Sequence, residues 1–227
     1  MLATTDEGSL RVVTFDRPDR RNALTPDGLD ALETAVTETD APVIYLRGAG
    51  DAFCAGADLD VVADLDDDEA AAFAERGQAV ARAIETSDSV VVAGIDGPAR
   101  GGGVELALAC DLRVATERAT FAETGVKLGL FGAWGGTVRL PRVVGEGDAM
   151  DIALSGRVVD AEEALRMGLV SRVVADPKAV AESLTDNDHT ALSLLKDRMR
   201  DAAPQETQEA REAETFATLI ERAEFDR

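Results

Sequence analysis

Cysteine, histidine and long apolar runs are scarce in this chain of 227 residues. Cys54 and Cys110 are its two cysteines, so a fold held together by disulfides is not expected, and both thiols are predicted to be buried. The single histidine, His189, has no cysteine or histidine near it in the sequence, which predicts a surface position and no metal site. No apolar stretch reaches the roughly 18 to 20 residues that a membrane-spanning helix needs, and the N-terminus lacks the basic start and apolar stretch of a signal peptide. These absences favour a cytoplasmic protein.

Positive charge is also scarce. Lysine and arginine together number 23 against 44 aspartates and glutamates, which gives a net charge of −21, and the lysines are only Lys127, Lys178 and Lys196. Such a surface repels phosphate backbones and anionic lipids, so neither nucleic-acid nor membrane binding is expected. Few lysines and many carboxylates favour a halophilic source, where molar salt shortens the Debye length to about 3 Å. The alternative is an acidic surface that binds a basic partner.

Apolar periodicity predicts an α/β fold with a helical C-terminal extension. Hydrophobic residues make up 45% of the chain, which is enough for a sizeable core. Strands are expected over residues 10–15, 42–47, 89–95 and 111–116, and helices after Thr25 and over residues 69–85, 104–109 and 206–222. The alternation of these elements predicts a core of residues 1–175. Residues 176–227 are polar, alanine-rich and helical, with a break at Pro204, and form the second predicted unit.

Two glycine-rich turns carry the strongest chemical signal. The first runs from Gly48 to Leu59 after a predicted buried strand, and the second runs from Asp96 to Leu112, after another strand and into a helix. Glycines at such junctions let the backbone approach a ligand and point N–H groups at it, and a helix N-terminus adds partial positive charge. Two such turns can direct two N–H donors at one oxygen, as an oxyanion hole does. Neither turn has the spacing of a dinucleotide fingerprint or of a P-loop.

Five segments, in order along the chain, resemble the enoyl-CoA hydratase/isomerase superfamily, also called the crotonase family. They are RPDRRNALT (17–25), VIYLRGAGDAFCAGADL (43–59), GPARGGGVELALACDLRVAT (97–116), FAETGVKLGLFGAWGGTVRLPRVVG (121–145) and ALRMGLVSRVV (164–174). The resemblance implies a spiral of ββα units whose C-terminal helices build homotrimers or dimers of trimers. It also implies an acyl-CoA thioester substrate and no cofactor beyond the CoA moiety of that substrate.

The resemblance assigns the oxyanion hole and the acyl pocket to particular residues. Ala57 and Gly102 would supply the two N–H groups, in agreement with the two glycine-rich turns. Residues 129–137 would line the acyl pocket, with Phe131 and Trp134 as an aromatic wall. Packing is the alternative role for the two aromatic side chains.

The resemblance also indicates where CoA would bind. Arg20 and Arg21 lie in the segment that approaches the CoA phosphates, and Asp58 and Leu59 offer backbone contacts to the adenine region. Relatives often carry a basic residue shortly after this point, where the present chain has Asp60. Surface charge explains the two arginines equally well.

The catalytic carboxylates match the family pattern only in part. Hydratases of this family use two glutamates, because adding water across a conjugated double bond needs both proton removal and proton delivery. The first falls on Glu105, whose apolar neighbours favour a buried catalytic group over a solvated residue in the first turn of a helix. The second falls on Gly125. Glu123 lies two residues earlier and would face the same side in an extended segment, where it would partly replace the missing group; a structural or solvated Glu123 is the alternative.

The leading expectation is an enoyl-CoA hydratase or isomerase that acts in fatty-acid or related acid breakdown. One acid/base group suffices for isomerisation, decarboxylation or thioester hydrolysis. Gly125 therefore leaves other crotonase chemistries open, namely decarboxylase, thioesterase or synthase activity. A non-catalytic binding or assembly subunit with the same fold is the remaining alternative.

Overall fold

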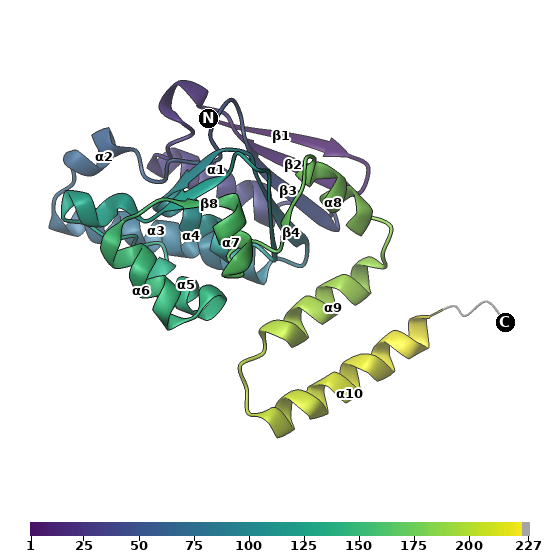
Figure 1. Cartoon of the computed structure of the whole chain (residues 1–227). Helices are drawn as coiled ribbons and strands as arrows, with labels where there is room; N and C mark the ends of the chain where they lie inside the picture. The colour runs from purple at the N-terminus through teal and green to yellow at the C-terminus, as the bar shows by residue number, and fades with distance from the viewer. Residues whose placement is uncertain (224–227) are drawn as a thin grey trace.

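A six-stranded sheet forms the centre of the structure, a computed structural model that describes residues 1–223 (Figure 1). Its strands, in spatial order, are β1 (Leu2–Glu7), β2 (Leu10–Phe15), β3 (Val43–Gly48), β4 (Val90–Ile95), β6 (Leu112–Ala115) and β9 (Arg172–Val173). All neighbours are parallel except the hairpin of β1 and β2. A smaller sheet contains β5 (Pro98–Arg100), β7 (Thr120–Ala122) and β8 (Val159–Asp160). The α/β architecture predicted from the sequence is confirmed.

Helices occupy the crossovers that a parallel sheet requires. They are α1 (Pro26–Thr37), α2 (Leu59–Ala63), α3 (Asp67–Thr86), α4 (Gly102–Ala109), α5 (Gly136–Val144), α6 (Glu146–Ser155), α7 (Ala161–Arg166), α8 (Pro177–Leu184), α9 (His189–Arg200) and α10 (Gln205–Arg222). Short 3-10 helices, η1 (Pro18–Arg20) and η2 (Thr124–Leu128), lie in two of the connections. Helix α1 begins directly after Thr25 as predicted, and Thr25 caps it, since its side chain accepts a hydrogen bond from the N–H of Gly28.

The central strands are buried on both faces because successive side chains point to opposite sides. On one side, Ile44 and Leu46 of β3 join a large apolar core with residues of α1, α3 and α4. On the other side, Val43 and Tyr45 join a smaller core that α8 covers with Val180. Burial on both faces is the reason why strands such as β3 are apolar at nearly every position.

Strand β1 was not predicted from the sequence. Five of its six residues are exposed, so it has no apolar alternation to detect. It is held by backbone pairing with β2, from Leu2 opposite Phe15 to Glu7 opposite Leu10. Backbone hydrogen bonds leave no trace in side-chain periodicity, which explains the omission.

Helix α4 is buried along its whole length, with every residue from Gly102 to Ala109 inaccessible. It is apolar on all sides apart from Glu105, and such a helix belongs inside a protein. The fold therefore places one carboxylate and the N-terminus of a helix in the interior, next to each other.

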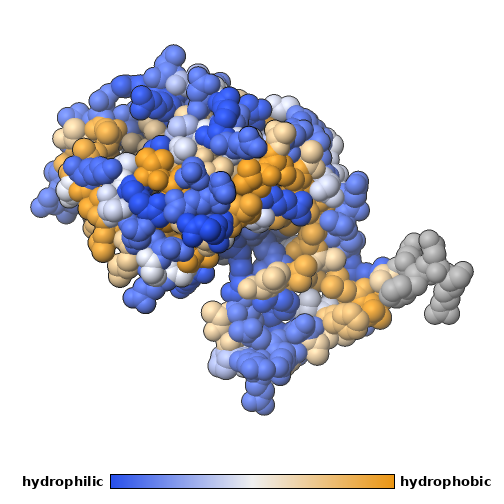
Figure 2. Space-filling view, viewed as in Figure 1, coloured by the Kyte–Doolittle hydropathy of each residue, from blue (hydrophilic) through white to orange (hydrophobic). Residues whose placement is uncertain are grey.

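The C-terminal helices divide into two groups. Helices α8 and α9 both contact the smaller apolar core of the sheet, α9 through Leu192, whereas α10 lies beyond α9 and away from the sheet (Figure 1). Hydrophobic residues are visible on α9 and α10 in Figure 2, and Met199 and Phe216 are exposed among them. Within residues 1–223, no helix combines the length and the apolar composition needed to cross a bilayer.

Gly77 of α3 provides a test of how tightly the helices pack. Its missing side chain makes room for the ring of Trp134, so a Cβ atom there would collide with the indole. We expect Gly77→Ala to lower the free energy of unfolding by about 1–3 kcal/mol. Gly147 of α6 is the matched control, because nothing lies within 4 Å of a Cβ atom at that position. Gly147→Ala should stabilise the protein by about 0.4–1 kcal/mol, and urea denaturation measures both; equal effects would contradict the packing described here.

Candidate active site

The two glycine-rich turns meet at the N-terminus of α4. A Cβ atom at Gly56, in the loop after β3, would lie 2.7 Å from both the nitrogen of Gly102 and the carbonyl oxygen of Arg100. Gly56 also has φ of +83°, in the left-handed region that favours glycine. This close approach brings Ala57 and Gly102 together on the wall of one cavity of about 260 Å³.

The N–H groups of Ala57 and Gly102 are available to a ligand. Gly102 is the first residue of α4, so its N–H has no acceptor within the helix. Across residues 1–223, neither this N–H nor that of Ala57 donates a hydrogen bond to the protein. The partial positive charge of the helix N-terminus adds to the attraction for an oxygen. Both residues thus border the cavity with an N–H group that the described part of the chain does not use.

Two polar side chains hold the loop that carries Ala57. The Asn22 amide donates to the carbonyls of Ala49 and Ala52 at 2.9 and 2.8 Å, and Asn22 itself has φ of +60°. Arg17 donates to the Asp58 carboxylate at 2.8 Å. Sequence reasoning assigned no role to Arg17 or Asn22, although both lie in the first of the five matching segments.

The Glu105 carboxylate is buried in a cradle of backbone. Glu105 is 1% exposed, and its Oε1 accepts hydrogen bonds from the N–H groups of Trp134 at 2.9 Å and Gly136 at 2.6 Å. Gly132 and Gly136 leave room for it, since a Cβ atom at either would lie 2.7 Å from a carboxylate oxygen. Burial raises the pKa of Glu105, while the two N–H groups and the charge of Arg139 act against that rise. The buried position predicted for this residue is confirmed.

Glu123 lines the same cavity without such support. It is 8% exposed, and within the described chain neither of its carboxylate oxygens has a hydrogen-bond partner. Burial, followed by the negative charge of Glu105, raises the pKa of Glu123 to about 8. A carboxyl group in this environment holds its proton at neutral pH.

The expectation of an extended segment at Glu123 is wrong. The chain turns into η2 directly after Glu123, so Glu123 and Gly125 do not alternate as they would in a strand. Both nevertheless border the cavity, together with Glu105. Glu123 is also not the solvated residue considered as an alternative.

The aromatic residues of the expected acyl pocket play different parts. Trp134 is 3% exposed and fills the space beside Gly102, where a Cβ atom would strike the indole. It makes an edge-to-face contact with Phe73, with ring centroids 5.6 Å apart. Phe131 is 73% exposed and borders both this cavity and a second, apolar one of about 310 Å³, which Glu123 also lines. Trp134 thus packs against the start of α4 while also lining the cavity, and Phe131 lies where the two hollows share residues.

Comparison with known proteins agrees with this geometry. The sequence model described as enoyl-CoA hydratase/isomerase matches residues 5–225. The chain belongs to this family.

Named relatives cover most of the chain. It is 41% identical to a crotonyl-CoA hydratase of Syntrophomonas wolfei over 78% of its own length and 70% of that protein. It is 37% identical to a short-chain-enoyl-CoA hydratase of Clostridium acetobutylicum, over 84% and 77% of the two chains. The crystal structure of an enoyl-CoA hydratase from Bacillus anthracis superimposes with a TM-score of 0.91 at 30% identity, over 97% of this chain and 91% of that one. The protein is accordingly an enzyme of the enoyl-CoA hydratase type with a crotonase-like fold.

Most of the residues that the sequence assigned to CoA binding lie at the surface of this family member. The exception is Asp58, which is buried. Arg20 is exposed and forms an ion pair with Asp60, and Arg21 is exposed beside it. Leu59 is exposed and borders the cavity, while the buried Asp58 carboxylate is occupied by Arg17 and by the N–H of residue 60. Neither arginine is among the described residues that line the cavity.

The two cysteines and the histidine occupy the buried and exposed positions expected from the sequence. Cys54 and Cys110 are free and buried, and burial raises the pKa of each thiol to about 12. His189 is exposed at the start of α9, and the described residues contain no cluster suited to a metal ion.

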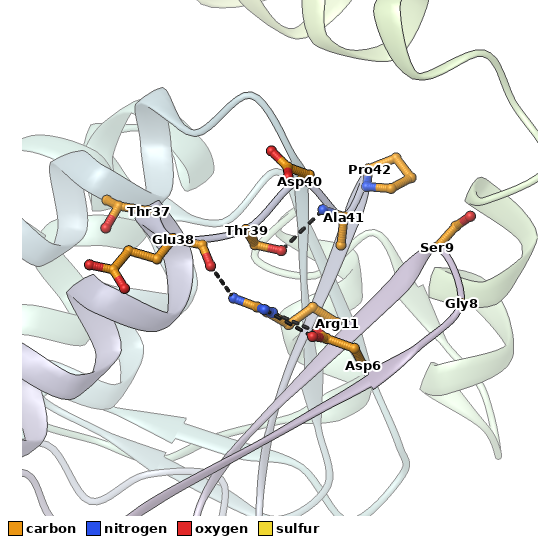
Figure 3. A pocket seen from close by; sticks show the side chains of 10 residues that line it. All are labelled: Asp6, Gly8, Ser9, Arg11, Thr37, Glu38, Thr39, Asp40, Ala41 and Pro42. Carbon is orange, nitrogen blue, oxygen red and sulfur yellow. Dashed lines mark hydrogen bonds and ion pairs between the residues drawn. The ribbon is translucent and has the colours of Figure 1, made fainter.

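A larger hollow of about 650 Å³ lies between the β1–β2 hairpin and the end of α1 (Figure 3). Its Arg11 is already engaged by Asp6 and by backbone carbonyls, and none of the predicted site residues borders it.

The raised pKa of Glu123 predicts a pH-dependent stability. Between about pH 4.5 and pH 8 the folded protein keeps a proton on Glu123 that the unfolded chain releases. The free energy of unfolding should therefore fall as the pH rises through this range, by on the order of a few kcal/mol. Glu123→Gln removes the effect, so the difference between wild type and variant in urea denaturation should change steadily over that window. The exposed Glu117→Gln is the control, and a constant difference for Glu123→Gln would contradict the assignment.

Proposed function

We propose that this protein hydrates short-chain 2-enoyl-CoA thioesters such as crotonyl-CoA, as part of fatty-acid or related acid breakdown. One observation carries the proposal: two free N–H donors and two carboxyl groups in opposite environments border a single cavity. The named activities of the relatives from Syntrophomonas and Clostridium agree with it.

The N–H groups of Ala57 and Gly102 receive the thioester carbonyl oxygen in this mechanism. As a nucleophile adds to the β-carbon, negative charge moves through the conjugated system to that oxygen. Donors fixed in place by the fold stabilise the enolate without having to reorganise, and a single donor of this kind typically contributes about 2.7–4 kcal/mol. Asn22 and the Arg17–Asp58 pair keep Ala57 in position.

The two carboxyl groups divide the proton transfers between them. Glu105 accepts two hydrogen bonds that favour its ionised form, so it acts as the base that takes a proton from the attacking water. Glu123 holds a proton at neutral pH and delivers it to the α-carbon of the enolate. The hydroxyl ends on the β-carbon, and a proton returned from Glu105 to Glu123 through solvent restores both groups. Environments that push two proton affinities apart are typical of acid/base pairs.

Double-bond isomerisation is the second candidate, and Gly125 favours it. Relatives with hydratase chemistry are expected to carry a glutamate there, and one remaining base can shuttle a proton between two carbons. A side chain at Gly125 would also press on the backbone of Leu130, since a Cβ atom would lie 3.2 Å from its carbonyl oxygen. Decarboxylase, thioesterase or synthase chemistry, or a non-catalytic subunit, would be supported by turnover or binding of other thioesters without hydration.

Binding of CoA is proposed at the surface beside the cavity, through Arg20, Arg21 and the backbone of Asp58 and Leu59. The ion pair of Arg20 with Asp60 must open or be shared for a phosphate to bind. Since the chain carries a net charge of −21, we also propose a halophilic cytoplasm in which salt screens repulsion between the protein and the anionic ligand.

The helical extension, residues 176–227, is proposed to assemble homotrimers or dimers of trimers around the core of residues 1–175. Exposed apolar side chains on α9 and α10, among them Met199, Phe216 and Ile220, support an interface there. Residues 224–227 of this expected unit lie outside the described residues. Membranes and nucleic acids are not proposed as partners, and no cofactor beyond the CoA of the substrate is invoked.

Two isosteric substitutions test the division of labour. Glu105→Gln and Glu123→Gln should each lower kcat/KM for hydration of crotonyl-CoA by about 100-fold or more, because each removes one proton transfer. Hydration is followed by the loss of the enoyl-thioester absorbance, with Glu117→Gln as a control that should match the wild type. Undiminished hydration in Glu123→Gln would remove Glu123 from the mechanism. Isomerase activity without hydration in the wild type would favour the second candidate.

The salt dependence of CoA binding tests whether the net charge of −21 opposes the anionic ligand. If short-range contacts bind CoA while salt screens repulsion, the affinity for acetyl-CoA should hold or improve between about 0.1 M and molar KCl. Isothermal titration calorimetry measures the affinity, and circular dichroism verifies that the protein stays folded at each salt concentration. A steep loss of affinity in folded protein would show that long-range attraction governs binding instead.

A further inference from the structure

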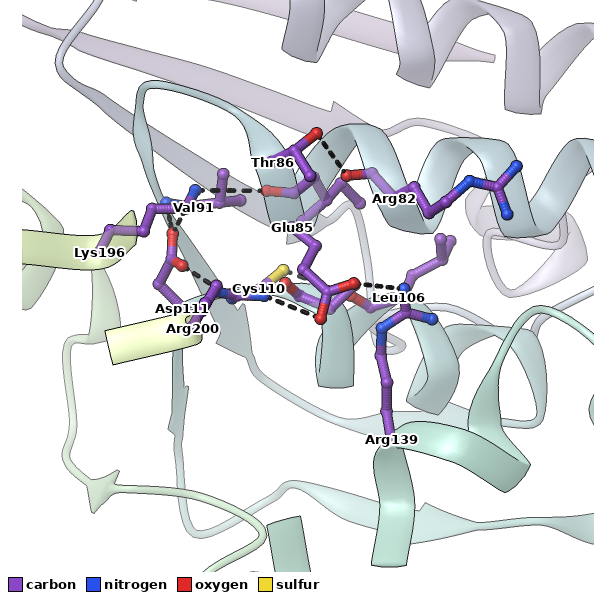
Figure 4. Close-up of polar contacts among 12 residues, drawn as sticks. Arg82, Glu85, Thr86, Val91, Leu106, Cys110, Asp111, Arg139, Lys196 and Arg200 are labelled. Carbon is purple, nitrogen blue, oxygen red and sulfur yellow. Dashed lines mark hydrogen bonds and ion pairs between the residues drawn. The ribbon is translucent and has the colours of Figure 1, made fainter. Parts of the chain in front are cut away.

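A chain of alternating charges runs from α9 to the helices around the active site (Figure 4). Lys196 and Arg200 of α9 contact the Asp111 carboxylate at 3.0 and 2.7 Å. Arg200 also reaches Glu85 of α3 at 3.1 Å, and the other oxygen of Glu85 accepts from Arg139 of α5 at 2.6 Å. Between 5% and 29% of each of these side chains is exposed, so the charges are largely withdrawn from water.

The last cation of this chain lies beneath the turn that holds Glu105. The guanidinium of Arg139 fills the space beside Gly135 that a side chain would occupy, and it donates to the carbonyl of Trp134 at 3.4 Å. On the opposite side of the same turn, the N–H groups of Trp134 and Gly136 point at Glu105. The same turn therefore binds a cation through the carbonyl of Trp134 and a carboxylate through the N–H groups of Trp134 and Gly136.

We propose that Arg139, held in place by Glu85, is a positioning residue for Glu105. It fixes the Trp134–Gly136 turn from behind, and it supplies the positive charge that favours the ionised base. The inference rests on the proposed function in that Glu105 is taken as the base of the reaction.

Few other charges compete for this role. Arg139 of α5 and Glu123, at the start of η2, are the charged groups that influence Glu105 in the described part of the chain. Glu85 of α3 acts on Glu105 only through Arg139, and Arg100 of β5 is committed to backbone carbonyls. Changing the charge of Arg139 or of Glu85 should therefore be felt at Glu105 in a defined direction.

Two substitutions should act in opposite directions. Arg139→Met removes the cation, which raises the pKa of Glu105 and moves the acidic limb of the kcat/KM profile to higher pH by about one unit. Glu85→Gln leaves Arg139 without its counter-charge, which lowers the pKa of Glu105 and moves the same limb to lower pH. In Arg139→Met, kcat should also fall about 10-fold while KM changes little, because Arg139 is not among the described residues that line the cavity. A general loss of structure would not produce opposite shifts.

Arg157→Met is the matched control, since Arg157 is paired with Asp151 and Glu163 away from the site. It should leave the pH profile unchanged. If Arg139→Met does not fold, Arg139→Lys is the second variant. It keeps the positive charge but cannot contact Glu85 and the Trp134 carbonyl at the same time. The acidic limb of the kcat/KM profile should then stay at the wild-type pH while kcat falls. Carboxyl carbon NMR of labelled glutamate gives the pKa of Glu105 directly, without relying on activity.

The outcomes distinguish the positioning role of Arg139 from the catalytic role of Glu105. An unshifted limb, or shifts of the same sign in Arg139→Met and Glu85→Gln, would overturn the positioning role while Glu105→Gln remains inactive. Full activity in Glu105→Gln would instead overturn the proposed function. An NMR-measured pKa that shifts in opposite directions in the two variants would support the role of Arg139 in either case.

Discussion

The burial of the Glu105 carboxylate is the constraint on which the active site depends. A charged group that is 1% exposed requires hydrogen bonds, because a buried charge without partners costs several kcal/mol. The N–H groups of Trp134 and Gly136 meet this requirement, and glycine at positions 132 and 136 leaves the necessary room. The connection between η2 and α5 is thus shaped around one side chain of α4. Because Gly102 begins the same helix, the proposed base and one of the two proposed oxyanion-hole residues lie on one element.

Two carboxyl groups on one cavity differ because their surroundings differ. Glu105 has backbone donors and a cation behind them, whereas Glu123 has neither among residues 1–223, and the negative charge of Glu105 further disfavours its ionised form. A protonated carboxyl carries no net charge, so the fold can bury it without a partner at lower cost. Two carboxyl groups that share a site can differ in proton affinity in this way, which is why the proposed function assigns one as base and the other as acid.

Charged side chains at the surface are mostly solvated carboxylates, whereas several of those in the interior form ion pairs. The surface is dominated by carboxylates that solvent and salt can screen, as the net charge of −21 requires. In the interior, anions and cations alternate from Lys196 through Asp111, Arg200 and Glu85 to Arg139, so that each charge has a partner of opposite sign. Ion pairs thus add to the apolar contact of Leu192 in holding α9 to the core.

The sequence by itself determined the parallel α/β sheet, the turns that carry Ala57 and Gly102, and the burial of Glu105. Each of these has a local signature: an apolar run, a glycine cluster after a strand, or a polar residue among apolar neighbours. Tertiary structure alone decided that β1 joins the sheet, that Glu123 lines the same cavity as Glu105 with no hydrogen-bond partner among residues 1–223, and that Arg139 meets a partner 54 residues away in the chain. The physical reason is that backbone pairing, desolvation and ion pairing depend on which distant segments come together, and side-chain periodicity reports only which face of each segment is buried.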